Sequence, residues 1–262
     1  TEALVELTLE DFPVVVAIDA DGEDLFARVS GSARFAGSPR MSGDAGTPAP
    51  DAVPAFITLE GGEGVGKSTQ AAILSERLSE LGRTVRLLRE PGGTALGDAV
   101  RELLLATDGP PLDAWTELIL YEASRSQLIV ERIRPALAAG EVVVCDRFCD
   151  STLAYQGYGR KLDLDAVREL NRRGAHGIVP DLTILLDLPV ALGIGRATTR
   201  GADRLESEDT EFHERVREGF LSIAAAEPDR VRVVRALGAP EEVADEIWGH
   251  VRRSSAGQPG AE

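Results

Sequence analysis

Residues 61–69 read Gly61-Gly62-Glu63-Gly64-Val65-Gly66-Lys67-Ser68-Thr69, which matches the phosphate-loop pattern Gly-x-x-x-x-Gly-Lys-Ser. An apolar run at 55–59 precedes this loop, and residues 68–81 repeat apolar side chains at helical spacing after it. In such a strand–loop–helix unit, backbone N–H groups converge on a phosphate at the positive end of the helix. We expect Lys67 to reach the β- and γ-phosphates of a nucleoside triphosphate, and the Ser68 hydroxyl to bind Mg²⁺.

From residue 55 onward, apolar runs alternate with helical patterns. Strands are predicted at 55–59, 84–88, 141–145, 182–188 and 231–234, and helices at 68–81, 95–105, 114–139, 163–174, 189–199, 207–226 and 240–252. Strands separated by helices predict a parallel sheet with helices on both faces and ligands at the carboxyl ends of the strands. The expected fold is therefore the α/β P-loop NTPase fold, with a five-stranded parallel sheet.

The first 54 residues differ in composition from the rest. They hold ten Asp and Glu against three Arg, and they end in a Gly/Pro/Ala-rich linker. Strand-like pieces at 14–18 and 25–29 flank an Asp21-Gly22 turn, but about 35 residues are too few to bury an independent core. We expect an appendage and linker of unknown role at 1–54, the main domain at 55–253 and a frayed tail at 254–262.

Charge and cysteine content narrow the class of protein. The net charge of −16 argues against DNA or RNA as a partner. No run approaches the roughly 20 apolar residues that cross a bilayer, and no signal peptide is visible, so we expect no membrane association. Cys145 and Cys149 have no histidine near them in the sequence and are expected to be reduced thiols. These features favour a cytoplasmic protein.

An acidic residue follows the strand predicted at 141–145, in the triplet Asp146-Arg147-Phe148. At the end of a strand that neighbours a phosphate loop, Asp146 is well placed to hold Mg²⁺ directly or through water. Arg147 can place two parallel hydrogen bonds on a phosphate. The alternative is a surface ion pair, but the position at a strand end favours the functional interpretation.

The helix predicted at 114–139 carries Tyr121 and Arg125 four residues apart, hence on one face. Tyr121 can stack on a nucleobase, a contact worth about 1–3 kcal/mol in nucleic-acid complexes, while Arg125 donates hydrogen bonds to a base carbonyl. In the alternative interpretation, Tyr121 packs in the core and Arg125 pairs with an exposed acid such as Glu122.

Two further segments carry arginines. The turn at 89–94, which precedes a helix with Arg101, can also be a simple connection. Arg196, Arg200 and Arg204 recur at a spacing of four, so their like charges gather on one side of any helix that includes them. A flap that closes over a triphosphate would relieve this repulsion, although charged surface helices are common.

Together the motifs resemble those of bacterial-type thymidylate kinases, from about Phe56 to about Ala226. The resemblance is carried by the phosphate loop and by the strings Arg89-Glu90-Pro91-Gly92-Gly93, Ala123-Ser124-Arg125, Asp146-Arg147-Phe148, Asp150-Ser151-Thr152-Leu153-Ala154-Tyr155-Gln156-Gly157-Tyr158-Gly159-Arg160 and Asp203-Arg204-Leu205-Glu206. Among these, Ala154-Tyr155-Gln156-Gly157 separates the family from adenylate and guanylate kinases.

The resemblance implies transfer of the γ-phosphoryl group of ATP to dTMP with Mg²⁺, in dTTP biosynthesis, by a homodimer. It assigns residues 61–69 to ATP, and Ser68 with Asp146 to the metal. The catalytic residues that it implies are Lys67, Asp146, Arg147, Arg200 and Arg204. The dTMP-binding residues that it implies are Glu63, Arg101, Tyr121, Arg125, Arg147, Thr152, Tyr155 and Gln156.

This chain departs from the family pattern at a few positions. Tyr121 stands where the family usually has Phe, and Glu122 where it prefers a small or apolar residue. Gly64 stands where eukaryotic-type members carry an arginine, so lid arginines are expected to provide the transition-state charge. The alternatives are a kinase of another nucleoside monophosphate or of a nucleoside, or a non-catalytic nucleotide switch.

Overall fold

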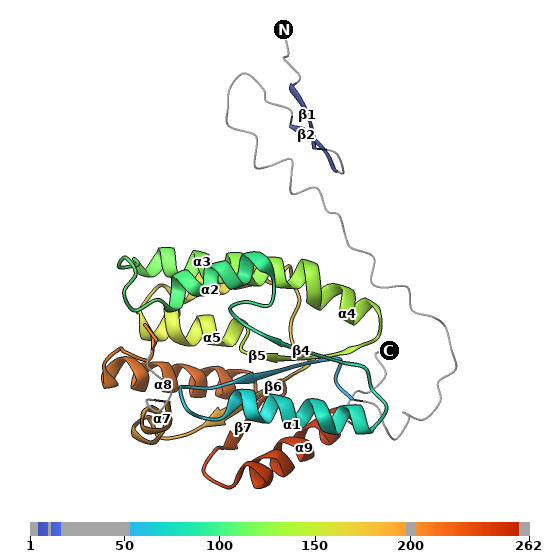
Figure 1. The fold of residues 1–262 in the computed structure, drawn as a ribbon, viewed down its shortest axis with the longest axis vertical. Coiled ribbons are helices and arrows are strands. Elements are labelled where there is room, and N and C mark those ends of the chain that lie inside the picture. The colour runs from blue at the N-terminus through green and yellow to red at the C-terminus, as the bar shows by residue number, and fades with distance from the viewer. Residues whose placement is uncertain (1–4, 10–11, 17–52, 198–202, 257–262) are drawn as a thin grey trace. The chain divides into compact units, whose positions relative to one another are not determined.

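A computed structural model describes residues 5–9, 12–16, 53–197 and 203–256 (Figure 1). Contacts within the chain divide it into two units, Thr1–Thr47 and Pro48–Glu262. None of the described helices is long and apolar enough to cross a membrane.

The first unit contains a hairpin of two antiparallel strands, β1 (Val5–Leu9) and β2 (Phe12–Val16). The strand predicted at 14–18 therefore lies two residues earlier, and its partner precedes it in the chain. The partner was missed although Val-Glu-Leu-Thr-Leu alternates apolar and polar residues, which is the pattern of a strand. The run predicted at 25–29 and the Asp21-Gly22 turn lie outside the described residues.

The second unit is built on a sheet of five parallel strands in the order β4-β5-β3-β6-β7. The strands are β3 (Phe56–Glu60), β4 (Val85–Arg89), β5 (Val142–Asp146), β6 (Leu182–Asp187) and β7 (Val231–Arg235). The predicted five-stranded parallel sheet is confirmed, with strand ends shifted by one residue in most cases. β3 pairs on both sides and is buried throughout, which explains its continuous apolar run.

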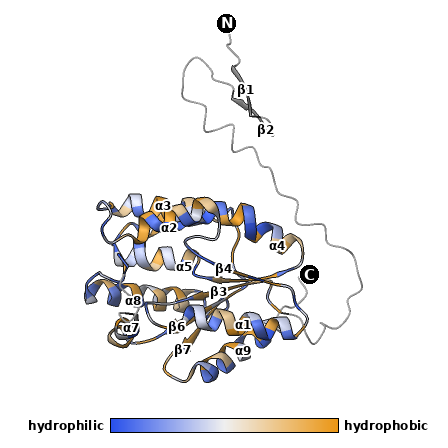
Figure 2. Ribbon diagram, in the orientation of Figure 1, coloured by the Kyte–Doolittle hydropathy of each residue, from blue (hydrophilic) through white to orange (hydrophobic). Residues whose placement is uncertain are grey.

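Helices cover both faces of the sheet (Figure 1). α1 (Lys67–Glu80) and α9 (Pro240–Ala256) lie on one face, where they pack on Ile57 and Leu59 of β3. α3 (Ala114–Leu128) lies on the opposite face with α8 (Thr210–Ala226), and Leu128 packs there against Phe56 of β3. The central strands β3, β5 and β6 between these layers are mostly apolar (Figure 2). The remaining helices are α2 (Ala95–Leu105), α4 (Arg134–Ala138), α5 (Cys149–Thr152), α6 (Leu164–Gly174) and α7 (Val190–Ala197).

Two π-helical segments interrupt the α-helices, η1 (Ile129–Ile133) and η2 (Leu153–Gly159). The sequence indicated no helix at 149–159, because its glycines lower helix propensity. Packing requires one of these glycines, since a Cβ at Gly159 would lie 2.7 Å from the Phe212 ring of α8. The helix predicted to start at 207 begins at 210, because the Asp209 side chain accepts a hydrogen bond from the Phe212 N–H as the N-cap.

Candidate active site

The phosphate loop connects β3 to α1 at the carboxyl edge of the sheet. Gly64 has φ +64°, a left-handed conformation that favours glycine. A Cβ on Gly64 would lie 2.1 Å from the carbonyl oxygen of Gly193 in α7. The close packing of α7 on the loop therefore leaves no room for the arginine that eukaryotic-type kinases carry at this position.

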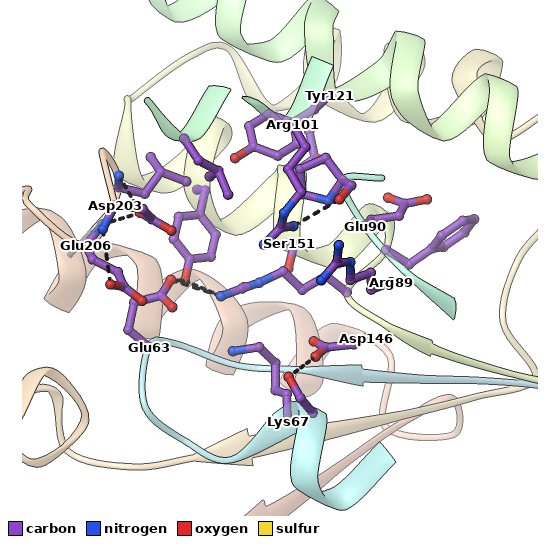
Figure 3. A pocket seen from close by; sticks show the side chains of 18 of the residues that line it. Glu63, Lys67, Arg89, Glu90, Arg101, Tyr121, Asp146, Ser151, Asp203 and Glu206 are labelled. Carbon is purple, nitrogen blue, oxygen red and sulfur yellow. Dashed lines mark hydrogen bonds and ion pairs between the residues drawn. The ribbon is translucent and has the colours of Figure 1, made fainter. Parts of the chain in front are cut away.

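Lys67 and Asp146 lie close together where the phosphate loop meets α1 (Figure 3). Lys67 Nζ donates hydrogen bonds to the carbonyl oxygens of Gly61 at 3.1 Å and Gly62 at 2.6 Å. Burial lowers the pKa of Lys67 to about 8. Ser68 Oγ donates to Asp146 Oδ2 at 2.6 Å, so the hydroxyl and carboxylate predicted to hold Mg²⁺ are adjacent.

The chemistry of these two side chains fits Mg²⁺, which prefers oxygen ligands and usually binds through one or two protein groups plus phosphates and water. In the described part of the chain, no group of three or more His, Cys, Asp or Glu side chains could hold a metal ion. A metal at Ser68 and Asp146 would therefore depend on nucleotide phosphates and water for its other ligands.

Arg147 forms the centre of the site. Its guanidinium donates hydrogen bonds to Glu63 Oε1 at 2.9 Å, Ser151 Oγ at 3.1 Å and the Tyr155 hydroxyl at 3.2 Å. It also lies 5.0 Å from the centroid of the Tyr155 ring, a cation–π contact. The Tyr155 hydroxyl donates in turn to Glu63 Oε1. Burial acts to raise the pKa of Glu63, but the charges of Arg147 and Lys67 outweigh it and lower this pKa to about 2.

A cavity of about 500 Å³ extends from the phosphate loop to α3. Fourteen of the predicted site residues line it: Glu63, Gly64, Gly66, Lys67, Ser68, Thr69, Arg101, Tyr121, Arg125, Asp146, Arg147, Thr152, Tyr155 and Gln156. Residues 89–91 line it as well, so the turn that could have been a simple connection forms part of the site. Gly61, Gly62 and Val65 lie on the other side of the loop.

The half-buried Tyr121 lines the far end of the cavity and packs on the core cluster of α3, η2 and α8. Figure 3 shows Tyr121 and Arg101 together at this end, opposite Lys67 and Asp146. Arg101 Nη1 donates to the carbonyl oxygen of Pro91 at 2.9 Å. The residues predicted to bind ATP and those predicted to bind dTMP thus line one continuous cavity.

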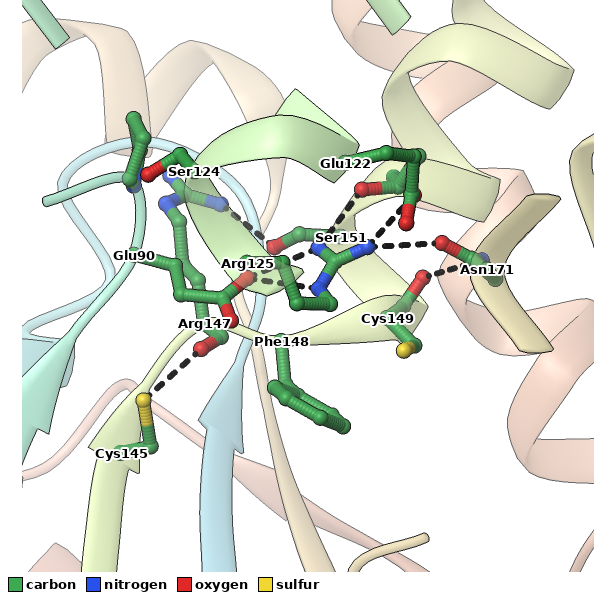
Figure 4. A network of polar contacts seen from close by, with 12 residues as sticks. Glu90, Glu122, Ser124, Arg125, Cys145, Arg147, Phe148, Cys149, Ser151 and Asn171 are labelled. Carbon is green, nitrogen blue, oxygen red and sulfur yellow. Dashed lines mark hydrogen bonds and ion pairs between the residues drawn. The ribbon is translucent and has the colours of Figure 1, made fainter. Parts of the chain in front are cut away.

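Arg125 is 1% exposed and is surrounded by acceptors (Figure 4). It donates hydrogen bonds to Glu90, Glu122, Asn171 and Thr152 at 2.6–2.8 Å, which engage four of its five N–H groups, and its Nη2 also lies 2.8 Å from Glu90 Oε2. Arg125 pairs with Glu122, as the alternative interpretation expected, and it also lines the cavity. Its hydrogen bond to a base carbonyl stays a prediction.

Glu122 is buried, so the expectation of an exposed acid at this position is wrong. Its carboxylate binds Arg125 Nη1 at 2.6 Å, which accounts for an acid where the family prefers a small residue. Gly174 makes room for it, since a Cβ there would lie 2.0 Å from Glu122 Oε2. Burial raises the pKa of the second carboxyl group on Arg125, that of Glu90, to about 7.

Thr152 and Gln156 lie on α5 and η2 beside Arg125 and line the same cavity. Thr152 Oγ1 accepts a hydrogen bond from Arg125, so its hydroxyl hydrogen is free to donate. Gln156 Nε2 donates to Glu117 Oε1 at 2.8 Å. Each side chain therefore has one hydrogen bond fixed by the protein and further hydrogen-bonding capacity left for a ligand.

The predicted lid is only partly described. Arg200 lies outside the described residues. Arg204 does not line the cavity, and its guanidinium donates to the carbonyl oxygens of Ala106 and Pro110 between α2 and α3. Arg196, at the end of α7, does line the cavity. The catalytic roles of Arg200 and Arg204 stay predictions.

Sequence reasoning missed three buried acids that support the site, Glu60, Glu90 and Glu117. Glu60 accepts hydrogen bonds from the Phe148 N–H at 2.7 Å and the Ser151 hydroxyl at 2.6 Å. An acid at the end of a strand was the signal used for Asp146, and it applies equally to Glu60. Glu117 precedes Tyr121 by one helical turn, and this spacing could have indicated it.

A family model described as thymidylate kinase matches residues 59–247 of this chain. The thymidylate kinase of Synechococcus sp. (strain JA-2-3B'a(2-13)) is 57% identical over 196 residues, which cover 75% of this chain and 93% of that protein. The thymidylate kinase of Deinococcus radiodurans is 52% identical over 199 residues, which cover 75% of this chain and 95% of that protein.

Among solved structures, the crystal structure of thymidylate kinase from Ehrlichia chaffeensis is similar, with a TM-score of 0.63 and 38% sequence identity. The match covers 75% of this chain and 97% of that one.

Proposed function

The chain belongs to the thymidylate kinase family, and we propose that it transfers the γ-phosphoryl group of ATP to dTMP, giving dTDP and ADP in dTTP biosynthesis. The observation that carries this proposal is the continuous cavity of about 500 Å³, with the phosphate loop at one end and Tyr121, Thr152 and Gln156 at the other. A non-catalytic switch needs one nucleotide site, whereas this cavity has polar groups for two.

At the ATP end, residues 61–69 hold the triphosphate through their backbone N–H groups and Lys67. Lys67 Nζ exchanges its contacts with the Gly61 and Gly62 carbonyl oxygens for phosphate oxygens. Ser68 and Asp146 would hold Mg²⁺, which when bound neutralises charge on the phosphates. The acceptor is already a phosphate oxyanion, so the reaction requires alignment and charge rather than a general base.

At the dTMP end, Arg101 and Arg147 bind the acceptor phosphate, and Tyr121 stacks on the base. Arg125, Thr152 and Gln156 face the polar edge of the base. Tyr155 and Glu63 lie beside the deoxyribose, where their hydrogen bonds to Arg147 hold them in place. In this assignment, Arg147 lies between the two nucleotides.

The charge that develops during transfer must be met by arginines outside the phosphate loop, because Gly64 packs against α7. We assign this role to the lid, with Arg200 and Arg204 as the catalytic residues. Arg200→Ala is then expected to lower kcat while the dTMP KM changes little, since the contact strengthens as charge develops. A kcat within about twofold of the parent for both Arg200→Ala and Arg204→Ala would contradict a lid mechanism.

The substrate is tested by ADP release from Mg²⁺-ATP with dTMP, dUMP, dCMP, AMP or GMP as acceptor. The proposal predicts a kcat/KM for dTMP far above those for dCMP, AMP and GMP. Equal or better turnover of any of these three would overturn it and would favour a kinase of another nucleotide. Omission of Mg²⁺ with excess chelator should abolish ADP release.

We further propose that the enzyme is a homodimer. Leu96 and Leu103 lie seven residues apart on α2, and Trp115 and Ile119 four apart on α3, so each pair shares one helix face. All four are at least 40% exposed. A dimer interface over these four apolar side chains would remove them from water, which favours association. Sedimentation should give a dimer for the parent and a monomer for Ile119→Glu, and a monomeric parent would contradict the proposal.

The remaining proposals concern location and the N-terminal segment. The net charge of −16 disfavours nucleic acid as a partner. The free cysteines Cys145 and Cys149 support a cytoplasmic location, where thiols stay reduced. Residues 1–54 are proposed to be an appendage and linker outside the kinase domain at 55–253. Deletion of residues 1–40 should leave kcat/KM for dTMP within about threefold, equal to about 0.7 kcal/mol. A larger loss or an insoluble product would show that the segment supports the kinase.

A further inference from the structure

We propose that Glu117, held by Arg160, is a positioning residue that fixes the orientation of the Gln156 amide and thereby sets which pyrimidine edge the enzyme accepts. This inference rests on the proposed function, since it concerns how the acceptor base is chosen. Glu117 lies on α3, one turn before Tyr121, and does not line the cavity. It therefore acts on the base only through Gln156.

The amide of Gln156 has one end bound and one end open. Its side chain is 1% exposed, and Nε2 donates a hydrogen bond to Glu117 Oε1 at 2.8 Å. Among the described residues, none donates a hydrogen bond to Gln156 Oε1. Because one Nε2 hydrogen is bound to Glu117, the orientation of the amide is fixed, and the acceptor that Gln156 offers a ligand in the cavity is Oε1, beside the second Nε2 hydrogen.

Arg160 holds the Glu117 carboxylate in place as the hydrogen-bond acceptor for Gln156. Its Nε and Nη2 donate to the two oxygens of Glu117 at 3.2 and 3.0 Å, so the carboxyl group is bound on both sides. Arg160 is itself held by Glu208 Oε1 at 2.6 Å and lies 4.8 Å from the centroid of the Phe212 ring. A carboxylate held in this way accepts hydrogen bonds and donates none.

This geometry opposes rotation of the Gln156 amide. A rotated amide would bring its carbonyl oxygen against a Glu117 oxygen and would lose a charge-assisted hydrogen bond. Glu117 is 2% exposed, so water could not replace the lost donor easily. The orientation of the amide is thus set by a carboxylate outside the cavity rather than by the ligand.

The fixed orientation distinguishes two kinds of pyrimidine. Thymine and uracil present an N3–H donor beside the O4 acceptor, whereas cytosine presents an N3 acceptor beside an amino donor. The outward Gln156 oxygen accepts from N3–H, and the free hydrogen of the Thr152 hydroxyl can donate to O4. With cytosine, the Gln156 oxygen would face the N3 acceptor and the Thr152 hydroxyl hydrogen would face the amino donor. A site built to form hydrogen bonds strongly rejects a base that leaves them unmade.

The test is Glu117→Gln in the full-length chain, with kcat and KM measured for dTMP, dUMP and dCMP. A glutamine here can present its own amide nitrogen to Gln156 and so permits the rotated amide. We expect the ratio of kcat/KM for dCMP to that for dTMP to rise at least about tenfold, which corresponds to about 1.4 kcal/mol. The change should lie mainly in the dTMP KM, and the ATP KM should not change.

Two controls separate this effect from general damage. The dUMP-to-dTMP ratio should not change, because both bases carry the same polar edge. Glu208→Gln removes the other acid that binds Arg160 and should leave the dCMP-to-dTMP ratio within twofold of the parent. If Glu117→Gln lowers kcat/KM for dTMP and dCMP equally, or leaves both unchanged, Glu117 has no role in base choice and the proposal is wrong.

The parent enzyme separates failure of this inference from failure of the proposed function. A parent that shows no preference for dTMP over dCMP overturns the proposed function itself. If Glu117→Gln does not fold, NMR of the ¹⁵N-labelled parent tests the same point, with the Gln156 amide signals assigned through Gln156→Met. Saturation with dTMP should shift the signal of the N–H that is bound to Glu117 little, and a large shift of this signal would mean that the hydrogen bond to Glu117 breaks when the base binds.

Discussion

Glu60, the last residue of β3 before the phosphate loop, is expected to make the stability of this protein depend on pH. Its carboxyl group is fully buried and accepts hydrogen bonds from the Phe148 N–H and the Ser151 hydroxyl. Burial, together with the nearby charge of Asp150, raises the pKa of Glu60 from 4.5 to about 8. Glu60→Gln replaces this group with one that cannot ionise and that keeps an acceptor for Phe148.

The magnitude follows from the protons bound in each state. Between the pKa of Glu60 in the unfolded chain, about 4.5, and its value of about 8 in the folded protein, the folded state binds one proton more. Stability is therefore full below pH 4.5 and is lost as the pH rises through 8, at about 1.4 kcal/mol per pH unit. From pH 5.5 to 7 this amounts to about 2 kcal/mol.

The measurement is urea unfolding of the parent and of Glu60→Gln between pH 5.5 and 7, at one protein concentration. Glu90, whose pKa is raised to about 7 by burial, contributes a slope of the same sign in both proteins and cancels in the comparison. The free energy of unfolding of Glu60→Gln should gain about 2 kcal/mol over the parent across this range. The exposed Glu76 of α1 provides the control, since Glu76→Gln should keep the slope of the parent. Parallel pH curves for the parent and Glu60→Gln would refute the reasoning.

Three other substitutions test separate parts of the site. Lys67→Ala should lower kcat at least about 10²-fold with circular dichroism unchanged, because Nζ provides charge at the reacting phosphates; full activity would exclude the phosphate-loop assignment. Gly64→Ala should weaken ATP binding in calorimetry, since its methyl group would lie 2.1 Å from the Gly193 carbonyl oxygen; parent affinity would show that α7 moves freely. Arg125→Met should lower the free energy of unfolding by about 3–5 kcal/mol, because Glu90 and Glu122 would stay buried without a cation; a loss under about 1 kcal/mol in urea titration would contradict this.

The sequence alone determined the fold class and one end of the site. Helices and strands form through backbone hydrogen bonds and apolar spacing within a few residues, so their periodicity is readable locally. The phosphate loop has the same property, since its glycines, Lys67 and Ser68 are consecutive. Asp146 was found because parallel strands end at one edge of the sheet, where β5 lies beside β3.

Segments with mixed signals were harder to predict. The helix at 149–159 was missed because glycines in η2 lower helix propensity, whereas packing on Phe212 requires Gly159. Local preference and tertiary contact conflict there, and the contact decides. In the N-terminal hairpin, the partner of Phe12–Val16 was overlooked although it directly precedes this strand in the chain and its apolar and polar residues alternate.

Only the tertiary structure decided how the polar groups of the site are shared. Arg125 binds Asn171, 46 residues away, and Gln156 binds Glu117, 39 residues away. Hydrogen bonds act over about 3 Å and depend on direction, so a shift of one helix by a fraction of a turn would exchange these partners. Residue type and spacing restrict which groups can meet, but the packing of α3 against η2 and α6 selects the pairs that form.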